Sequence, residues 1–286
     1  LVLIKLFFLR VISFIIYQIS NFFLFRAFDK NINIIDLILI NSSSTVSNYA
    51  TPIKIGFPLQ ILLLKKILNI SYKLSGIIIF FSVIMSIFIA VLLSLSYIIT
   101  NPFILSNISL LSFEFILIGL GVIIFLLILF FSLSINIHRN AYIIKIFKKF
   151  FELKENLLSL NIRYLIISFS LMLFGFFMNA WMINIILVDF NEDVSILNLF
   201  FMQGIPYLLA MISMIPLGLG IKDASLTYLI VQTGVQSQTA LLCAILMRIL
   251  TSGFSIITGF FSINYLMKKN IFDKQIFKNF NIEDSN

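Results

Sequence analysis

The chain has 286 residues, of which 60% are hydrophobic and only 11% are charged. A soluble globular protein usually carries about 45–50% apolar and about 25% charged residues, so the composition excludes an ordinary water-soluble domain. The formal net charge of +8 would suggest a nucleic-acid partner in a soluble protein, but the Lys and Arg residues fall in short loops between apolar runs. Basic residues in such loops are topology signals, and we expect no nucleic acid among the partners.

Long charge-free runs dominate the chain, and each is close to or above the roughly 20 residues that a membrane-spanning helix needs. We expect helices, because backbone groups in hydrocarbon must be satisfied internally and the runs lack the alternation of a membrane barrel. The runs are Leu74–Phe113, Phe115–Ile137, Tyr164–Val188, Val194–Ile221, Ala224–Met247 and Ile249–Met267. The sequence therefore predicts an all-α, polytopic integral membrane protein that forms a single membrane domain over residues 1–286.

The first interrupted stretch, residues 34–64, has an apolar start, a polar patch over residues 41–45 and then Pro52, Gly56 and Pro58. Proline removes a backbone donor and glycine favours non-helical conformations, so one half-helix should end here and another begin. We interpret the stretch as a re-entrant helical hairpin with both ends in the cytoplasm, because basic residues flank it on both sides. These residues are Arg26, Lys30, Lys65 and Lys66.

Two loops fix the expected orientation of the later spans. The loop 138–163 is rich in Lys and Arg, and together with the tail 268–286 it should be cytoplasmic. The turn after Val188 carries only acidic charges, at Asp189, Glu192 and Asp193, and should lie outside. We therefore expect a multi-pass protein of the cell (inner or plasma) membrane, with its basic loop and its C-terminus in the cytoplasm.

The second interrupted stretch, residues 195–235, is broken over residues 215–223 by one proline and two glycines. We interpret it as a re-entrant hairpin from the outside that precedes one full span, although three full spans would satisfy the same two ends. The halves 1–137 and 164–267 then mirror each other, each with a span, a hairpin and a span. This is the pattern of an inverted-topology repeat, in which broken helices meet near the midplane and form a transport site.

The mirror arrangement makes one demand on the first span. It requires the N-terminus to lie outside, whereas Lys5 and Arg10 favour the inside. Truncation before Leu1 or a short initial segment would account for the difference.

Ionisable residues within the apolar stretches are informative, because each costs about 2.5–3.5 kcal/mol at a helix centre. Arg248 lies roughly 15 Å into the last span, near the midplane. It could meet an anionic headgroup or form a structural ion pair with Asp223, and the two roles can coexist. Asp223 could equally cap a helix start. Lys222 would open the second half-helix, where free N–H groups and a cation make an anion site, and Lys54 has the corresponding place in the first hairpin.

Little in the sequence suggests covalent chemistry. There is one histidine, His138, and one cysteine, Cys243, and no Asp/Glu pair in the membrane spaced for catalysis or metal binding. We therefore expect no enzymatic activity, no cofactor and no metal site, and an intramembrane transferase is a poorly supported alternative.

Two motifs give the interrupted stretches a family resemblance. The second stretch contains Pro216-Leu217-Gly218-Leu219-Gly220-Ile221-Lys222-Asp223, followed by Gly234-Val235, Arg248 and Gly259. It resembles the transmembrane, flippase-like family named after lysylphosphatidylglycerol synthase, with Lys-Asp in place of the family's Arg-Glu. The first stretch matches the family's Pro-Ala-Arg-x-Gly-Glu motif at Pro52-Ile53-Lys54-Ile55-Gly56, but Phe57 stands in place of the glutamate and Gln60 where the family often has arginine.

The resemblance implies a transporter that moves phospholipids or polyprenyl-linked sugars between leaflets, often near a glycosyltransferase. The synthase activity does not carry over, since in that family it belongs to a separate soluble domain. We expect a flippase-like transporter of an anionic phospholipid or polyprenyl-linked lipid, with membrane lipids and a membrane glycosyltransferase as partners. The expected substrate-binding residues are Lys54, Gly56, Pro216, Gly218, Gly220, Lys222, Asp223 and Arg248. A transporter of a small soluble anion and a non-transporting scaffold for a glycosyltransferase are the alternatives.

Overall fold

The computed structural model describes residues 2–50, 55–101, 160–213, 215 and 218–269, and every regular element in these ranges is helical. The elements are α1 (Val2–Ala27), α2 (Ile34–Ala50), α3 (Gly56–Leu68), α4 (Tyr72–Thr100), α8 (Ile162–Asp189), α9 (Ile196–Met202), α10 (Gly204–Ile212), α11 (Ile221–Val231), α12 (Ser237–Arg248), the π-helical turn η2 (Ile249–Gly253) and α13 (Phe254–Lys268). The all-α prediction is confirmed. The predicted span Phe115–Ile137, most of the basic loop 138–163 and the tail beyond residue 269 lie outside the described residues.

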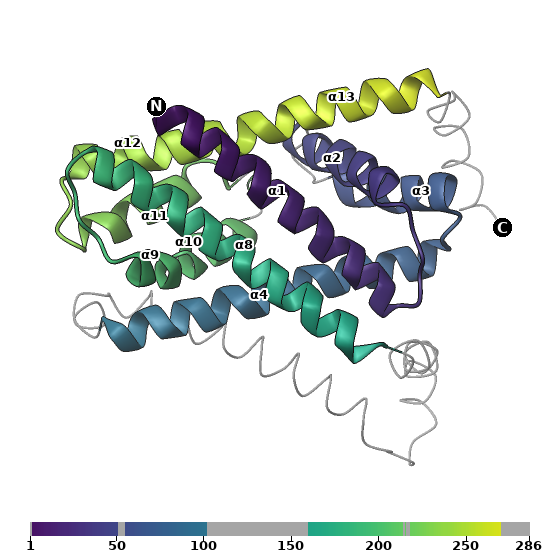
Figure 1. Cartoon of the computed structure of the whole chain (residues 1–286), viewed down its shortest axis with the longest axis horizontal. Coiled ribbons are helices and arrows are strands. Elements are labelled where there is room, and N and C mark those ends of the chain that lie inside the picture. The colour runs from purple at the N-terminus through teal and green to yellow at the C-terminus, as the bar shows by residue number, and fades with distance from the viewer. Residues whose placement is uncertain (1, 51–54, 102–159, 214, 216–217, 270–286) are drawn as a thin grey trace, which may run out of the picture.

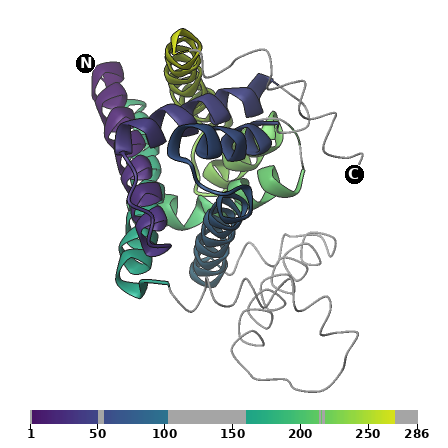
Figure 2. The same ribbon diagram turned by 90° about the vertical axis from the view of Figure 1, so that its right-hand side faces the viewer.

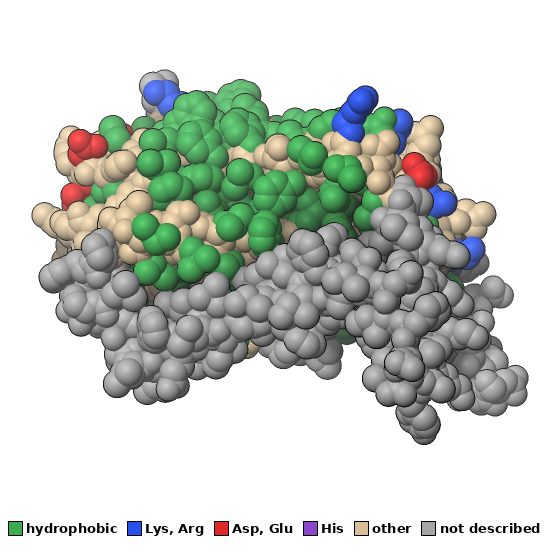
Figure 3. Space-filling view, turned by 90° about the horizontal axis from the view of Figure 1, so that it is seen from below, with side chains coloured by type: hydrophobic (Ala, Val, Ile, Leu, Met, Phe, Trp, Pro, Cys, Tyr) green, Lys and Arg blue, Asp and Glu red, His purple; other side chains and the backbone are tan. Residues whose placement is uncertain are grey.

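The described part of the chain contains four helices that are long and apolar enough to cross a membrane. They are Val2–Ala27, Tyr72–Thr100, Ile162–Asp189 and the composite helix Ser237–Lys268. Large apolar side chains cover the outside of these helices, and Phe80, Phe260 and Phe261 are each more than 60% exposed. Figure 3 shows hydrophobic side chains along the middle of one face and charged side chains at its two ends. The protein is therefore embedded in a membrane and crosses it several times.

The long helices run in two opposite directions. The backbone N–H of Asn161, just before α8, donates to the Ala27 carbonyl at the end of α1 over 3.0 Å. The N–H of Gln236, just before α12, donates to the Glu192 carboxylate just after α8 over 3.3 Å. Helices α1 and α12–α13 therefore run antiparallel to α8, and Figure 1 shows α4 running in the same direction as α8.

The two ends of this bundle differ in charge. We call the end where α4 and α8 finish the acidic end, because it carries Asp189, Glu192 and Asp193. We call the opposite end, which carries Arg26, Lys65, Lys66 and Arg163, the basic end. The N-terminus of α1 lies at the acidic end, as the mirror arrangement requires. Arg10 contacts α13 inside the bundle and is therefore not the topology signal that the sequence suggested.

The first interrupted stretch forms two helices, α2 and α3, that pack against each other. The start of α2 and the end of α3 both lie toward the basic end (Figure 1). Polar side chains of α2 hold the start of α3. The Gly56 N–H donates to Asn48 Oδ1 over 2.8 Å, and the Ser44 hydroxyl donates to the Gly56 carbonyl over 2.6 Å. A Cβ at Gly56 would lie 2.1 Å from the Ser44 carbonyl oxygen, so only glycine allows this approach.

The second interrupted stretch also doubles back on itself. Helix α10 packs against α11, and the residues that flank the stretch, Glu192 before it and Gln236 after it, are joined by a hydrogen bond. The chain turns between these helices through two glycines with positive φ, Gly218 at +62° and Gly220 at +79°. Residues with a Cβ rarely adopt this conformation, so the predicted break falls where the glycines require it. The stretch also has an additional break at Gln203, which separates α9 from α10.

Helices α1 and α8 form one side of the bundle, and α13 and α4 lie along opposite edges (Figure 2). Where α1 crosses α8, Ser20 and Ser168 donate hydrogen bonds to each other's carbonyls over 2.8 and 2.9 Å. Small hydroxyl residues allow this close approach in a membrane, where no hydrophobic force draws helices together. Two apolar clusters of buried side chains fill the interior of the described residues, with Met182 in one and Ile89 in the other.

Gly204 gives a direct test of the packing between α10 and α4. A Cβ there would lie 2.0 Å from the Ala90 carbonyl oxygen, whereas a Cβ at Gly175 in α8 would meet nothing within 4 Å. We predict that Gly204→Ala lowers the free energy of unfolding by about 1–3 kcal/mol through overpacking. Gly175→Ala should leave stability unchanged or raise it by up to about 1 kcal/mol. Thermal unfolding in detergent micelles checks this, and equal melting temperatures for the two variants would contradict the close contact.

Candidate functional site

The start of α11 joins a helix cap to an ion pair. The N–H of Gly220 donates to Asp223 Oδ2 over 3.3 Å, which caps the helix. The same oxygen accepts a hydrogen bond from the Arg248 guanidinium and forms a salt bridge with it. Asp223 therefore has both of the roles that the sequence suggested. The side chains of Asp223 and Arg248 remain 20% and 29% exposed, so the pair can be reached from outside the protein.

Arg248 lies at a local change of helix type. Helix α12 ends at Arg248 and continues as the five-residue π-helical turn η2 before α13 begins. Single π-helical turns within α-helices occur frequently at functional sites, because they change the direction of side chains and free backbone groups. The Thr251 carbonyl in this turn accepts a hydrogen bond from the Arg10 guanidinium over 3.4 Å.

Arg10 reaches this turn from α1, far away in the sequence. It also donates to the Ser255 hydroxyl over 3.4 Å, and its guanidinium lies 5.6 Å from the centroid of the Phe254 ring. Its Nε atom is buried and has no hydrogen-bond partner among the described residues. Because guanidinium has five N–H donors and both of its hydrogen bonds here are long, Arg10 retains capacity to bind an anion.

Lys222 adds a third cation in the first turn of α11. Its side chain is exposed, and its charge interacts with those of Arg10, Asp223 and Arg248. We call these four residues the charge cluster. Three cations and one carboxylate leave two positive charges in excess. Tyr49, near the end of α2, also lies within electrostatic range of Arg10, so the first helix pair approaches the cluster as well.

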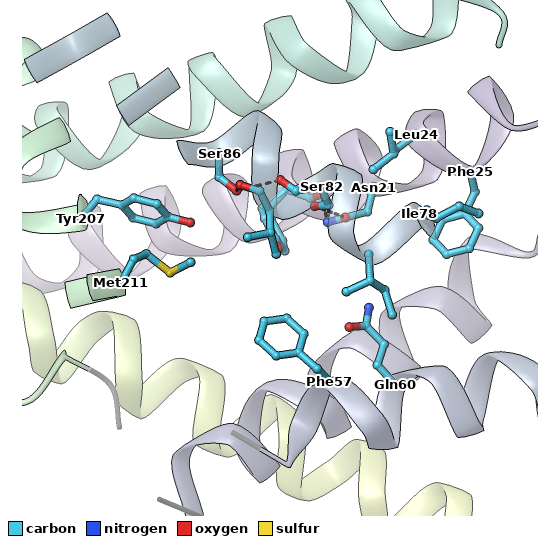
Figure 4. A pocket seen from close by; sticks show the side chains of 13 residues that line it. Asn21, Leu24, Phe25, Phe57, Gln60, Ile78, Ser82, Ser86, Tyr207 and Met211 are labelled. Atoms are coloured by element: carbon cyan, nitrogen blue, oxygen red, sulfur yellow. Dashed lines mark hydrogen bonds between the residues drawn. The ribbon is translucent and has the colours of Figure 1, made fainter. Parts of the chain in front are cut away.

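A cavity of about 130 Å³ lies between the two helix breaks. Figure 4 shows Phe57 and Gln60 entering it from α3, just after the first break, and Tyr207 and Met211 from α10, just before the second. The remaining walls come from α1 and α4. The lining residues are Tyr17, Asn21, Leu24, Phe25, Phe57, Gln60, Ile78, Ile79, Ser82, Val83, Ser86, Tyr207 and Met211.

A chain of amide hydrogen bonds holds the wall of this cavity. The Gln60 amide donates to Asn41 Oδ1 over 2.8 Å, and the Asn41 amide donates to Gln18 Oε1 over 2.9 Å. These bonds connect α3, α2 and α1. Gln18 and Asn41 are buried, which accounts for part of the polar patch that interrupts the first apolar stretch.

The structure brings part of the predicted site together. Gly218 and Gly220 form the turn before the charge cluster, to which Lys222, Asp223 and Arg248 belong. Gly56 lies instead in the contact between α2 and α3, where it makes the close approach possible. Lys54 and Pro216 lie outside the described residues.

Sequence reasoning missed Arg10 and the cavity. From the sequence, Arg10 is interpreted only as a positive-inside topology signal for the N-terminus. A detectable signal did exist, since Arg10, Ser13, Tyr17 and Asn21 recur every three or four residues along a mostly apolar helix and share one face. Polar residues inside membrane helices usually face the interior of the bundle.

The chain matches the family described as lysylphosphatidylglycerol synthase TM region over residues 2–259. Because this match covers most of the sequence, the chain belongs to that family, as its two motifs predicted. It is a membrane protein of the flippase-like type. No curated protein and no solved structure matches the chain. Among the described residues, no group of His, Cys, Asp and Glu side chains could hold a metal ion.

The Asp223–Arg248 pair can be tested by a double-mutant cycle. We predict that Asp223→Asn and Arg248→Gln each lower the free energy of unfolding by about 1–3 kcal/mol, because each leaves a partly buried group without its partner. The double variant should lose less than the sum by about 1–2 kcal/mol, since the two residues contact each other. Unfolding followed by Trp181 fluorescence in micelles measures this, with the exposed Asp193→Asn as control. Strictly additive losses would argue against the pair.

Proposed function

We propose that this member of the lysylphosphatidylglycerol synthase transmembrane family moves an anionic phospholipid or an anionic polyprenyl-linked lipid between the two leaflets of its membrane. The observation that carries the proposal is the charge cluster, in which three cations, Arg10, Lys222 and Arg248, accompany one carboxylate, and only Arg248 is bonded to it. An uncompensated charge inside a membrane protein is costly, and such charges commonly mark substrate paths. An anionic headgroup would neutralise the excess positive charge while its tails remain in the bilayer.

The helix breaks support the location of this site. The first turn of α11 points its backbone N–H groups toward the Gly218–Gly220 turn, and a helix start of this kind favours an anion. Lys222 lies in the first turn of α11. Tyr49, near the end of α2, lies within electrostatic range of Arg10. A phosphate at this position would meet the start of α11 and the cations of the charge cluster, which come from α1, α11 and α12.

We further propose that both helix pairs are re-entrant and that the two halves of the chain form an inverted repeat. The first pair opens at the basic end and the second at the acidic end, as the mirror arrangement requires (Figure 1). In this proposal the basic end is cytoplasmic and the acidic end faces outward, in the cell membrane. Alternating access would then involve movement of one half against the other around the charge cluster.

We propose that the protein moves the lipid without forming or breaking a covalent bond in it. A lipid that is only moved needs a cationic site and a polar path, and the charge cluster supplies the first of these. A membrane glycosyltransferase is a proposed partner that would use or supply the transported lipid.

Leaflet exchange tests the transport proposal. Purified protein in liposomes should accelerate the exchange of labelled anionic phospholipids or polyprenyl-phosphate lipids. We predict that Lys222→Ala and Arg248→Ala each reduce this rate by at least about tenfold, because each removes a charge-assisted contact worth about 1.5–3 kcal/mol. Lys268→Ala, which removes an exposed cation at the end of α13, should retain the rate of the original chain. Both groups of variants should insert equally.

The outcomes separate the alternatives. Exchange that survives both Lys222→Ala and Arg248→Ala would exclude the charge cluster as the site. Uptake of soluble anions without lipid exchange would favour a soluble-anion transporter. Co-purification of a glycosyltransferase without any transport would favour a scaffold.

Cysteine labelling tests the topology separately. In a Cys243→Ala background, we predict that a membrane-impermeant maleimide labels Asp193→Cys and Gln238→Cys on intact cells, since they flank the second helix pair at the acidic end. Asp29→Cys and Lys66→Cys, which flank the first pair at the basic end, should be labelled only after permeabilisation. Labelling of only one member of either couple on intact cells would show that this helix pair crosses the membrane.

A further inference from the structure

The cavity between the helix breaks is lined by neutral side chains that contribute several oxygen atoms. None of its lining residues carries a formal charge. The oxygens belong to two amides, two serine hydroxyls and two phenols, those of Asn21, Gln60, Ser82, Ser86, Tyr17 and Tyr207. The hydrogen bonds of the amides and serines decide whether donors or acceptors face the space.

Both amide groups use their nitrogen in the wall of the cavity. The Asn21 amide nitrogen donates to the Tyr17 backbone carbonyl over 2.9 Å, within α1. The Gln60 amide nitrogen donates to Asn41 Oδ1 over 2.8 Å, and Asn41 lies outside the lining. Because an amide carries its oxygen and its nitrogen on different sides, the acceptor end of each group is left for the cavity. In Figure 4 the Gln60 oxygen is turned toward the Phe57 ring, which lines the same space.

The two serines of α4 present acceptors as well. The Ser86 hydroxyl donates to the Ser82 carbonyl over 2.7 Å, which uses its hydrogen and leaves the lone pairs of its oxygen. The Ser82 hydroxyl lies 3.5 Å from Asn21 Oδ1, longer than the about 2.5–3.0 Å of a good O–H···O hydrogen bond. Asn21 is only 7% exposed, so its oxygen is a buried acceptor whose one hydrogen bond within the described residues is long.

A separation of 3.5 Å between two oxygens suits a shared metal cation. Oxygen ligands lie about 2.3–2.6 Å from Ca²⁺, and Na⁺ has nearly the same radius, so two neighbouring ligands at right angles are about 3.3–3.7 Å apart. Ca²⁺ usually takes carboxylates among its ligands, whereas the lining contains none. The neutral oxygens of the cavity therefore match a monovalent cation better than a divalent one.

The volume allows the cation to keep part of its water shell. A void needs only about 10–15 Å³ to hold one water molecule, so a cavity of about 130 Å³ accommodates an ion and several waters. These waters would complete the roughly six ligands that a hard cation of this size takes. The Tyr207 hydroxyl, which points into the open space in Figure 4, can bind one of them.

We propose that this cavity binds one partly hydrated Na⁺ ion through the side-chain oxygens of Asn21, Gln60 and Ser82. These ligands come from α1, α3 and α4, which all belong to the first half of the chain, while Tyr207 and Met211 of α10 line the site from the second half. A bound cation therefore joins three helices of one half where they face the other. The site goes beyond the proposed function, because binding of the ion requires no lipid.

Direct binding of radioactive sodium tests the site. The full chain in detergent micelles is titrated with labelled NaCl, and choline chloride keeps the ionic strength constant. We expect saturable binding that unlabelled NaCl displaces and choline chloride does not. Potassium chloride should compete more weakly than NaCl, because the larger ion needs a wider spacing of its ligands.

Two variants of the ligands should change the affinity in opposite directions. Ser82→Ala removes one oxygen and should weaken sodium binding by at least about fivefold, the equivalent of about 1 kcal/mol. Asn21→Asp keeps the shape of the side chain and adds a negative charge, so it should tighten binding by at least about fivefold. A gain of this kind cannot arise from misfolding.

Ser96→Ala is the matched control. Ser96 lies in the same helix as Ser82 and outside the lining, and its hydroxyl donates to the Leu92 carbonyl over 2.9 Å. This variant should bind sodium as the original chain does.

Three results would overturn the proposal. Absence of saturable sodium binding by the original chain would leave the cavity to water alone. Saturable binding that neither Ser82→Ala nor Asn21→Asp changes would place the ion elsewhere in the protein. Stronger competition by potassium or calcium chloride than by NaCl would exclude sodium as the ion. All three are measured without lipid exchange, so the proposed function stands or fails separately.

Discussion

Backbone polar groups freed by a helix break at membrane depth must find partners within the protein, because hydrocarbon offers none. Both helix breaks meet this requirement with side chains. Asn48 and Ser44 pair with the backbone of Gly56 at the first break, and Asp223 pairs with that of Gly220 at the second. The polar residues in these apolar stretches are therefore a condition for the fold.

The same requirement explains the charge cluster. Asp223 is held at the start of α11 by its cap, and this fixed carboxylate gives Arg248 a partner within the bundle. The π-helical turn that follows Arg248 presents a carbonyl to Arg10. One acidic residue therefore positions one cation directly, while the second is held by the turn, and the excess positive charge remains available. The structural ion pair and the proposed anion site therefore involve the same residues.

Helix α1 has a larger role than its place at the start of the chain suggests. Its polar face contacts the charge cluster at Arg10, lines the cavity at Tyr17 and Asn21, and joins the amide chain at Gln18. Helix α1 also makes the reciprocal serine pair with α8, which lies at the crossing of the two helices. One helix therefore contributes side chains to both the cavity and the charge cluster.

The sequence by itself determined the membrane class, the helical fold, both breaks and the family, because these depend on local properties: apolar length, Pro and Gly positions, and short motifs. It also identified Lys222, Asp223 and Arg248, since a charge in an apolar stretch stands out without any knowledge of its neighbours. Only the tertiary structure decided that Arg10 faces Thr251, more than two hundred residues away, and that side chains of α1, α3, α4 and α10 enclose one cavity. Such contacts depend on how helices cross, and crossing is set by packing at positions such as Ser20 and Gly204, whose effect no local pattern reveals.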